Sequence, residues 1–151
     1  MVDFRLARKG EVGILSELAM RSKGHWGYDA AFLEACRGEL TITPARIHCE
    51  TVWVAVEAGE VIGFGSLLVE GDDAELTDLF VDPDHIGSGV GQALWDRTVA
   101  TGQEKGVTRI RIEADPYAEQ WYLKRGAVRV GEAPSGSIPG RMLPLLEFVV
   151  G

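Results

Sequence analysis

Apolar residues follow two different spacings along the first half of the chain. In residues 2–6 they alternate with polar residues, which predicts a strand with one buried face. Over residues 9–22 they recur every three or four positions, which predicts a helix. Residues 51–56 and 61–69 are rich in β-branched and apolar side chains. Because Ala58-Gly59-Glu60 separates these two runs, we expect a hairpin.

Capping residues mark two more helix starts before the hairpin. Asp29 can accept a hydrogen bond from the first turn of a helix, which predicts a helix over residues 30–37. Thr43-Pro44 indicates another start, because proline is favoured at the first helical position. The elements expected after the turn at Gly71-Asp72-Asp73 are a strand over 75–81, a helix following Gly91, a strand around 107–112, a short helix over 117–124, and strands over 126–130 and 142–150.

The size and composition of the chain suit one globular domain over residues 1–151. Of its 151 residues, 46% are hydrophobic and 25% are charged, which is enough for a single core. No signal-peptide pattern follows Met1, and no window approaches the roughly 20 apolar residues that a membrane span needs. We therefore expect a cytoplasmic protein without a membrane partner.

Charge and cysteine content narrow the expected partners. The net charge of −8 argues against a nucleic acid as the main partner, because such binding depends on clustered Lys and Arg. The same charge is compatible with a cationic substrate. Cys36 and Cys49 have neither CxxC nor Cys/His metal spacing, so we interpret them as free thiols in a reducing cytosol and expect no metal site.

A glycine cluster lies in the segment 82–91, DPDHIGSGVG, between an expected strand and an expected helix. Gly87, Gly89 and Gly91 occupy every second position. A loop there can present backbone N–H groups and a helix N-terminus to an anion such as a pyrophosphate. The segment has neither the Gly-Lys-Ser/Thr of a Walker A loop nor GxGxxG spacing. Taken alone, the cluster is equally compatible with a tight turn.

Two segments resemble the GNAT superfamily of acetyl-CoA-dependent N-acetyltransferases. Residues 76–106 are similar to the strand, acyl-CoA loop and helix of that family, whose loop reads Gln/Arg-x-x-Gly-x-Gly/Ala. Gly89 and Gly91 match its glycines, whereas Ile86 stands where Gln or Arg is usual. Residues 114–132 match the second family pattern at Ala118, Trp121, Tyr122 and Gly126, with Asp115 in place of an asparagine and Ala127 in place of a phenylalanine.

The resemblance implies a fold and a cofactor. The fold is α/β (α+β), with a mixed, mostly antiparallel central sheet of about seven strands flanked by about four helices. The cofactor is acetyl-CoA, with coenzyme A as product and no metal. The residues that would contact it are Leu79, Phe80, Val81, Ile86, Gly87, Ser88, Gly89, Val90, Gly91, Gln92, Asp115, Ala118 and Tyr122.

The implied reaction is attack of an amine on the acetyl thioester. Tyr122 matches the family tyrosine that protonates the departing sulfur; as an alternative, it is a core aromatic residue. A lysine-like amine has a pKa of about 10.4, so a base or a water chain must remove its proton. Glu75 and Asp78 are the candidate bases, although either can be structural. In an unbroken strand, these two carboxylates point to opposite faces unless a bulge intervenes.

The resemblance also implies that the acceptor pocket lies between the first two helices and the loop before the last strand. In this chain, the candidate residues there are His25, Trp26, Tyr28, Ser137 and Arg141. Trp26 and Tyr28 can form an apolar or cation-binding wall. His25 is a candidate base or a hydrogen-bonded loop histidine. Arg141 can bind a substrate carboxylate or form a structural ion pair, and Ser137 can bind substrate or close a turn.

Other functions remain open at this point. A non-catalytic acyl-CoA-binding or sensor module would keep the glycine loop without needing Tyr122. Transfer of a longer acyl chain, or transfer to an oxygen, would use the same loop. The apolar last strand can also pair with a second subunit, which makes a homodimer possible.

Overall fold

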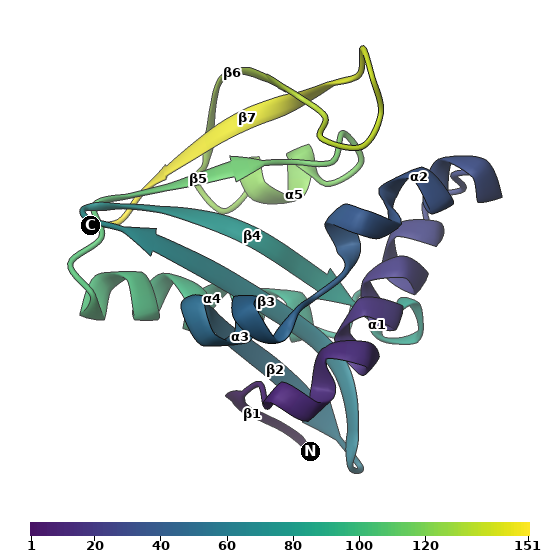
Figure 1. Ribbon diagram of the computed structural model, residues 1–151. Coiled ribbons are helices and arrows are strands. Elements are labelled where there is room, and N and C mark those ends of the chain that lie inside the picture. The colour runs from purple at the N-terminus through teal and green to yellow at the C-terminus, as the bar shows by residue number, and fades with distance from the viewer.

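One seven-stranded sheet runs through the molecule, and helices pack on both of its faces (Figure 1). The structure is a computed structural model that describes residues 1–151. The strands are β1 (Val2–Leu6), β2 (Thr51–Glu57), β3 (Glu60–Glu70), β4 (Asp73–Val81), β5 (Arg109–Glu113), β6 (Val128–Pro134) and β7 (Met142–Val149). The α-helices are α1 (Val12–Gly24), α2 (Ala30–Leu40), α3 (Pro44–Cys49), α4 (Val90–Glu104) and α5 (Glu119–Leu123).

The strand order is β1-β2-β3-β4-β5-β7-β6, and every neighbouring pair is antiparallel except β4 with β5. The predicted mixed, mostly antiparallel sheet of about seven strands is therefore confirmed. Five α-helices form where the resemblance implied about four, in agreement with the helix segments expected along the chain, which include the short one after Thr43. The Asp29 and Thr43 side chains cap α2 and α3 as predicted.

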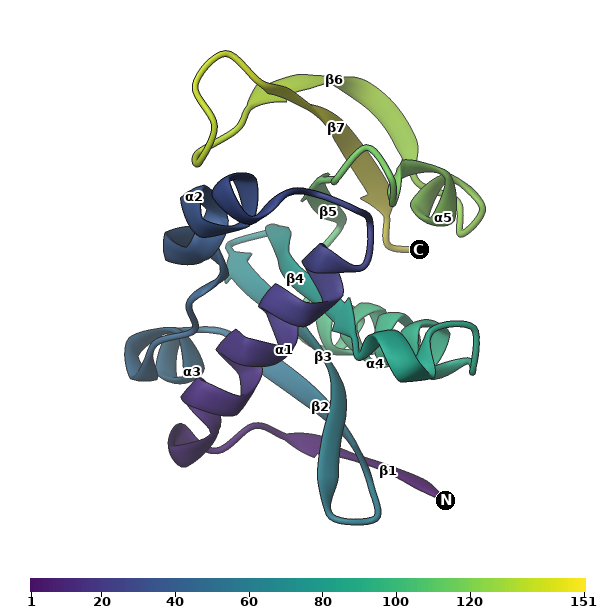
Figure 2. The same ribbon diagram turned by 90° about the vertical axis from the view of Figure 1, so that its right-hand side faces the viewer.

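The helices form two layers on opposite faces of the sheet. Figure 2 shows α1 and α3 on one side of the central strands and α4 on the other. Val54 packs with Leu15 and Leu18 of α1, whereas its neighbour Ala55 packs with Leu94 of α4. All five residues are fully buried, as expected when successive positions of a strand point to opposite faces of a sheet that is covered on both sides.

The start of α4 approaches the sheet closely because β3 carries a glycine there. A Cβ at Gly63 would lie 3.0 Å from Leu94 Cδ1, 3.1 Å from the Phe80 carbonyl oxygen and 3.2 Å from Val90 Cγ1. Only a residue without a side chain leaves room for the first turns of α4 at this position. The glycine loop that precedes α4 is thereby held next to β4.

Strands β4 and β5 pair only at their beginning. Their parallel register joins residues 73–75 to residues 109–111, and β4 then continues to Val81 without a β5 partner. β4 is also bulged, because Leu67 lies opposite Leu76 whereas Ser66 lies opposite Asp78. The result is a gap between the two strands in the middle of the sheet, visible in Figure 1.

The last strand is an interior strand, which corrects one expectation. β7 lies between β5 and β6 and pairs with both, so its backbone is not open to a second subunit. β6 occupies that edge of the sheet instead.

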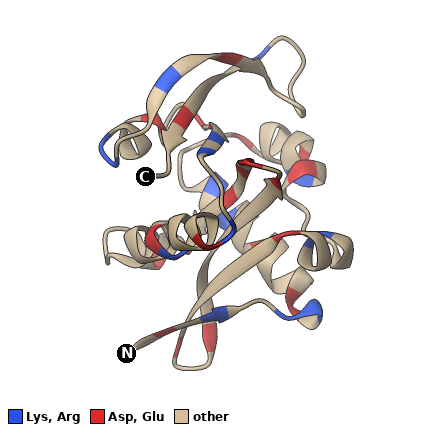
Figure 3. Ribbon diagram, turned by 90° about the vertical axis from the view of Figure 1, so that its left-hand side faces the viewer, with Lys and Arg blue, Asp and Glu red and all other residues tan.

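Cys36 and Cys49 are free thiols, as expected. No helix reaches the length and apolar character needed to cross a bilayer. Figure 3 shows Lys and Arg interspersed with Asp and Glu along helices and loops.

Candidate active site

A cavity of about 910 Å³ opens where β4 and β5 diverge. This volume lies within the usual range of small-molecule sites. Six parts of the chain form its wall: the end of α1, the α2–α3 segment, residues 75–81 of β4, the glycine loop with the first turn of α4, the segment from Ile112 to Arg125, and Leu143 of β7. The sheet gap therefore brings together segments that are distant in sequence.

The glycine loop forms one end of this cavity. Gly87 has φ 86° and Gly89 has φ 91°, a left-handed conformation that favours glycine. Gly89 is the N-cap of the 15-residue helix α4, so unpaired N–H groups of its first turn lie at the cavity. This is the arrangement that holds a phosphate at a helix N-terminus.

Most of the coenzyme residues expected from the sequence line this wall. They are Leu79, Phe80, Val81, Ile86, Gly87, Gly89, Gly91, Gln92, Asp115, Ala118 and Tyr122. Two others do not. The Val90 side chain is buried in the core between α4 and β3, and the Ser88 hydroxyl donates to the carbonyl oxygen of His85. The Val90 side chain is therefore not available to a ligand, and the Ser88 hydroxyl already uses its proton within the loop.

The β4 bulge places both candidate bases on the same side of the sheet. Because two residues of β4 oppose one step of β3 at Thr77, Glu75 and Asp78 both line the cavity. Glu75 makes no ion pair and no side-chain hydrogen bond within the protein. Burial, followed by the negative charge of Glu113, raises the pKa of Glu75 above its ordinary value.

Asp78 is held by other protein groups. Its Oδ2 accepts from the Arg46 guanidinium and from Ser66 Oγ at 3.0 Å. Arg46 also binds Glu50 at 2.8 Å, and Glu50 accepts from Thr77. Burial raises the pKa of Asp78 to about 6, although Arg46 and Ser66 lower it. Arg46 was not predicted as a site residue. No pattern within the six-residue helix α3 indicates that Arg46 forms an ion pair with Asp78 of β4.

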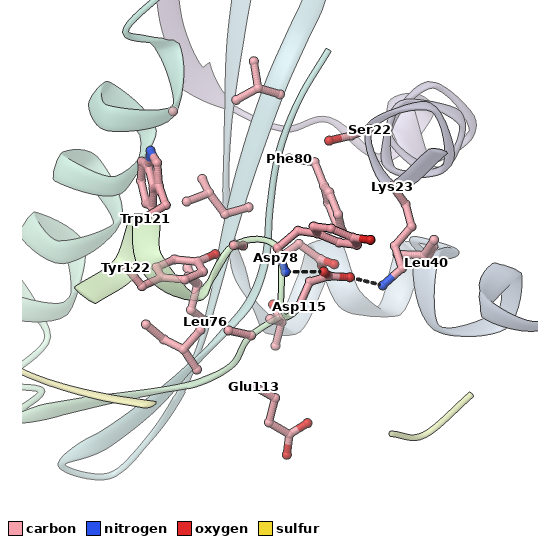
Figure 4. Close-up of a pocket in the computed structure, with 18 of the residues that line it drawn as sticks. Ser22, Lys23, Leu40, Leu76, Asp78, Phe80, Glu113, Asp115, Trp121 and Tyr122 are labelled. Atoms are coloured by element: carbon pink, nitrogen blue, oxygen red, sulfur yellow. Dashed lines mark hydrogen bonds and ion pairs between the residues drawn. The ribbon is translucent and has the colours of Figure 1, made fainter. Parts of the chain in front are cut away.

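Tyr122 lies in the cavity wall with 7% of its surface exposed. Its hydroxyl makes no hydrogen bond within the protein. Figure 4 shows Tyr122 and Trp121 on one side of the pocket and Lys23 paired with Asp115 on the other. Burial, followed by the charges of Asp78 and Asp115, raises the pKa of Tyr122. The phenol is therefore protonated at neutral pH and can donate a hydrogen bond into the cavity.

The pattern of the Acetyltransferase (GNAT) family matches residues 15–127. This range contains the glycine loop, β4 and Tyr122. The chain belongs to the GNAT family. Over 95 residues it is 32% identical to serotonin N-acetyltransferase 2, chloroplastic, of Oryza sativa subsp. japonica. That match covers 60% of this chain and 48% of the rice protein, so the chain spans about half the length of this relative.

Solved structures share the whole fold at low sequence identity. The paiA N-acetyltransferase of Thermoplasma acidophilum, solved with coenzyme A, aligns with a TM-score of 0.83 at 18% identity over 99% of both chains. The yncA protein of Salmonella typhimurium, solved with its cofactor acetyl-CoA, aligns with a TM-score of 0.71 at 20% identity over 100% of this chain and 95% of its own. These likenesses establish the GNAT fold for this chain.

Asp115, which replaces the usual GNAT asparagine, is saturated by protein contacts. Lys23 Nζ donates at 2.8 Å and the Tyr28 hydroxyl at 2.9 Å to its Oδ2, and the Tyr117 N–H donates at 2.9 Å to its Oδ1. Arg141 Nη2 lies 3.8 Å from Asp115 Oδ2 and donates to the Tyr28 hydroxyl at 2.8 Å. Burial raises the pKa of Asp115, but Lys23 and the other donors outweigh it and leave the pKa below its ordinary value. This carboxylate joins three segments of the GNAT chain.

One of the five predicted acceptor residues lines the cavity, and the other four do not. Trp26 lines the cavity and stacks on Tyr117, with ring centroids 5.5 Å apart and an interplanar angle of 3°. Tyr28 and Arg141 do not line the cavity and are bound to each other and to Asp115. His25 touches the edge of Trp26, and Ser137 donates its N–H to Ser135 Oγ; neither lines the cavity. Tyr117 was missed, although it directly precedes the matched Ala118.

Proposed function

We propose that this GNAT protein transfers the acetyl group of acetyl-CoA to the nitrogen of an amine. The observation that carries the proposal is one continuous cavity. It joins the glycine loop at the start of α4, the gap between β4 and β5, and the Tyr122 hydroxyl. A pyrophosphate at the loop and a thioester at the gap would use both ends of it. Acetyl-CoA supplies the activated acetyl group when bound.

Glu75 is the base that we assign to the incoming amine. The amine must lose a proton to attack, and a base whose pKa is raised toward neutrality accepts one more readily. Glu75 has a raised pKa and no partner, whereas Asp78 is already bound by Arg46 and Ser66. Asp78 then serves to orient Arg46 and the bulged strand, with proton removal as its alternative role.

Negative charge develops on the thioester as the amine attacks. Hydrogen-bond donors must therefore face the thioester from the side opposite Glu75. β4 beyond Glu75 has no β5 partner, so backbone N–H groups around Leu79 to Val81 are candidates to stabilise the oxyanion. The Tyr122 hydroxyl donates to the sulfur as the carbon–sulfur bond breaks. Its raised pKa makes it a hydrogen-bond donor to the thiolate, with the final proton reaching sulfur from Tyr122 or from water.

The acceptor class follows from the aromatic wall. Residues Trp26 and Tyr117 are 38% and 57% exposed, and both line the cavity. Aromatic faces bind apolar rings and also attract cations. The rice relative carries the name serotonin N-acetyltransferase. We therefore propose a primary amine that bears an aromatic or apolar group.

Calorimetric titration with acetyl-CoA and with coenzyme A tests the cofactor directly. Micromolar affinity for both is expected, and absence of binding would contradict the proposal. Turnover is then measured with arylalkylamines such as tryptamine and phenethylamine, an aliphatic diamine and a peptide N-terminus. Arylalkylamines are expected to show the highest kcat/KM. Tight binding with no turnover on any acceptor would favour the sensor module instead.

A further inference from the structure

Two buried side-chain nitrogens in this protein have no hydrogen-bond partner, and both belong to residues of the cavity wall. They are Nδ1 of His85 and Nε of Arg125. Buried polar groups are almost always paired, so unpaired nitrogens in two side chains of one cavity wall direct attention to what these side chains bind. His85 immediately precedes the glycine loop, and Arg125 follows α5. Both nitrogens therefore belong to the coenzyme end of the cavity.

Arg125 is fixed in place by Trp121. Its guanidinium carbon lies 3.5 Å from the centre of the Trp121 ring, and one terminal nitrogen donates to the Trp121 carbonyl oxygen at 2.8 Å. The edge of the same indole that carries Cζ2 lies against α4. A Cβ placed at Gly91 would be 3.5 Å from Trp121 Cζ2. One aromatic ring thus separates the Arg125 cation from the first turn of α4.

Arg125 is also the one Lys or Arg of the cavity wall that has no acidic partner. Lys23 is bound to Asp115, and Arg46 is bound to Glu50 and Asp78. The glycine loop itself contributes the apolar Ile86 and no basic side chain. In a chain of net charge −8, an unpaired guanidinium beside a phosphate-binding loop is suited to a second anion.

We propose that Arg125 binds the 3′-phosphate of coenzyme A. The inference rests on the proposed use of acetyl-CoA. The backbone N–H groups of the loop and of α4 account for the pyrophosphate. The 3′-phosphate is the remaining charged group of the coenzyme. Arg125 has no acidic partner, and the terminal nitrogen that is not bound to Trp121 is free to bind this phosphate. Arg125 would then set the preference for coenzyme A over dephospho-coenzyme A.

The test compares the Kd of coenzyme A with that of dephospho-coenzyme A by calorimetry. Wild-type protein is expected to prefer coenzyme A by about tenfold or more, as for one charge-assisted contact. In Arg125→Gln this preference should fall to within about twofold, because only coenzyme A loses a contact. Lys124→Gln removes the same charge from the neighbouring exposed position and should keep the preference. Arg125→Lys should keep part of it, and added salt should reduce it in the wild type.

Two results would overturn the assignment. The first is a wild-type protein that binds both coenzymes equally well. The second is an Arg125→Gln variant that loses the same factor for both, which would mean that Arg125 supports Trp121 or the pyrophosphate. Each variant is compared with wild type by thermal unfolding, and Arg125→Lys replaces a variant that fails to fold. Failure of the proposed acetyl-CoA function would give a different result from failure of the Arg125 assignment. In that case, the wild-type protein would bind neither coenzyme A nor dephospho-coenzyme A.

Discussion

Asp78 and Asp115 line the same cavity, but their surroundings shift their pKa values in opposite directions. Asp78 sits deep under the bulge of β4, where burial raises its pKa to about 6 against the effect of Arg46. Asp115 receives donors from Lys23, Tyr28 and Tyr117, which together leave its pKa below the ordinary value. Asp78 is more deeply buried and has fewer hydrogen-bond donors than Asp115, and these two differences together explain the opposite pKa shifts.

Replacing Asp78 with Asn tests this difference through stability. Between the unfolded pKa of about 3.9 and the folded value of about 6, the folded protein holds more protons at this site than the unfolded chain. The wild-type contribution of Asp78 to the free energy of unfolding therefore falls as pH rises through that window. Urea unfolding at pH 4 to 7 should show Asp78→Asn gaining stability relative to wild type as pH rises. Asp73→Asn, at an exposed position, provides the baseline. The reverse trend would mean that the Arg46 ion pair outweighs burial.

Replacing Tyr122 with Phe removes a hydroxyl that makes no contact inside the protein. Because the ring remains packed against Trp95 and Trp121, the fold should be retained. We expect turnover to fall at least tenfold, about 1.4 kcal/mol in barrier height, since the leaving sulfur loses its donor. Coenzyme A affinity measured on the same variant should stay within about twofold. Unchanged turnover would remove Tyr122 from the mechanism.

At the scale of elements, the site depends on three local departures from regular structure. The glycine loop bends into the left-handed region before α4, β4 carries a bulge at Thr77, and β4 separates from β5 after Glu75. In a regular sheet, the β4 backbone would pair with β5 along its length. Glu75 and Asp78 would then point to opposite faces of the sheet. The geometry of the candidate site therefore depends on interruptions of the regular elements.

Gly89→Val tests the loop against a matched glycine elsewhere. Gly89 has φ 91° at the start of α4, and Gly59 has φ 79° in the β2–β3 turn. No atom lies within 4 Å of a Cβ built at either position, so backbone strain is common to both. Both variants should lose stability, but only Gly89→Val should raise the Kd for coenzyme A, by at least tenfold. Equal coenzyme affinity in the two variants would contradict phosphate binding at the loop.

At the scale of the whole molecule, Asp115 connects parts of the chain that the sheet alone does not hold together. It joins Lys23 of α1, Tyr28 of the α1–α2 loop and Arg141 before β7. In Figure 4 the Lys23–Asp115 pair spans the side of the pocket opposite Tyr122. We interpret this cluster as a structural element that holds together the segments around the proposed acceptor side of the cavity.

Asp115→Asn should lower the free energy of unfolding by about 1–3 kcal/mol at pH 7, because Lys23 keeps its charge in a partly buried position without a counter-ion. The lowered folded pKa means that this contribution is present at neutral pH and is lost as pH falls below about 4. Asp73→Asn, which breaks an exposed pair with Arg109, should cost little.

Coenzyme affinity of Asp115→Asn separates two roles for this residue. Because protein donors already occupy its carboxylate, we expect the Kd for coenzyme A to change by less than about twofold. The KM for the amine should rise, since the acceptor wall loosens. A clear loss of coenzyme affinity would instead return Asp115 to the coenzyme site that the sequence resemblance implied.

The sequence by itself determined the order of the elements, their caps, the glycine loop and the two GNAT-like segments. These are local patterns: spacing of apolar residues, a capping side chain, or glycines at alternate positions of one loop. The helix boundaries moved by a few residues, and the loop and Tyr122 fell on the same cavity. Such features are legible because residues close in sequence set them.

Only the tertiary structure decided the chemistry of the individual groups. Asp78 is bound by Arg46, 32 residues away, and Asp115 by Lys23, 92 residues away. The face on which Glu75 and Asp78 lie depends on a bulge between β3 and β4, and the interior place of β7 depends on its pairing with β5 and β6. Burial and charge pairing arise when distant segments pack, so no local pattern encodes them.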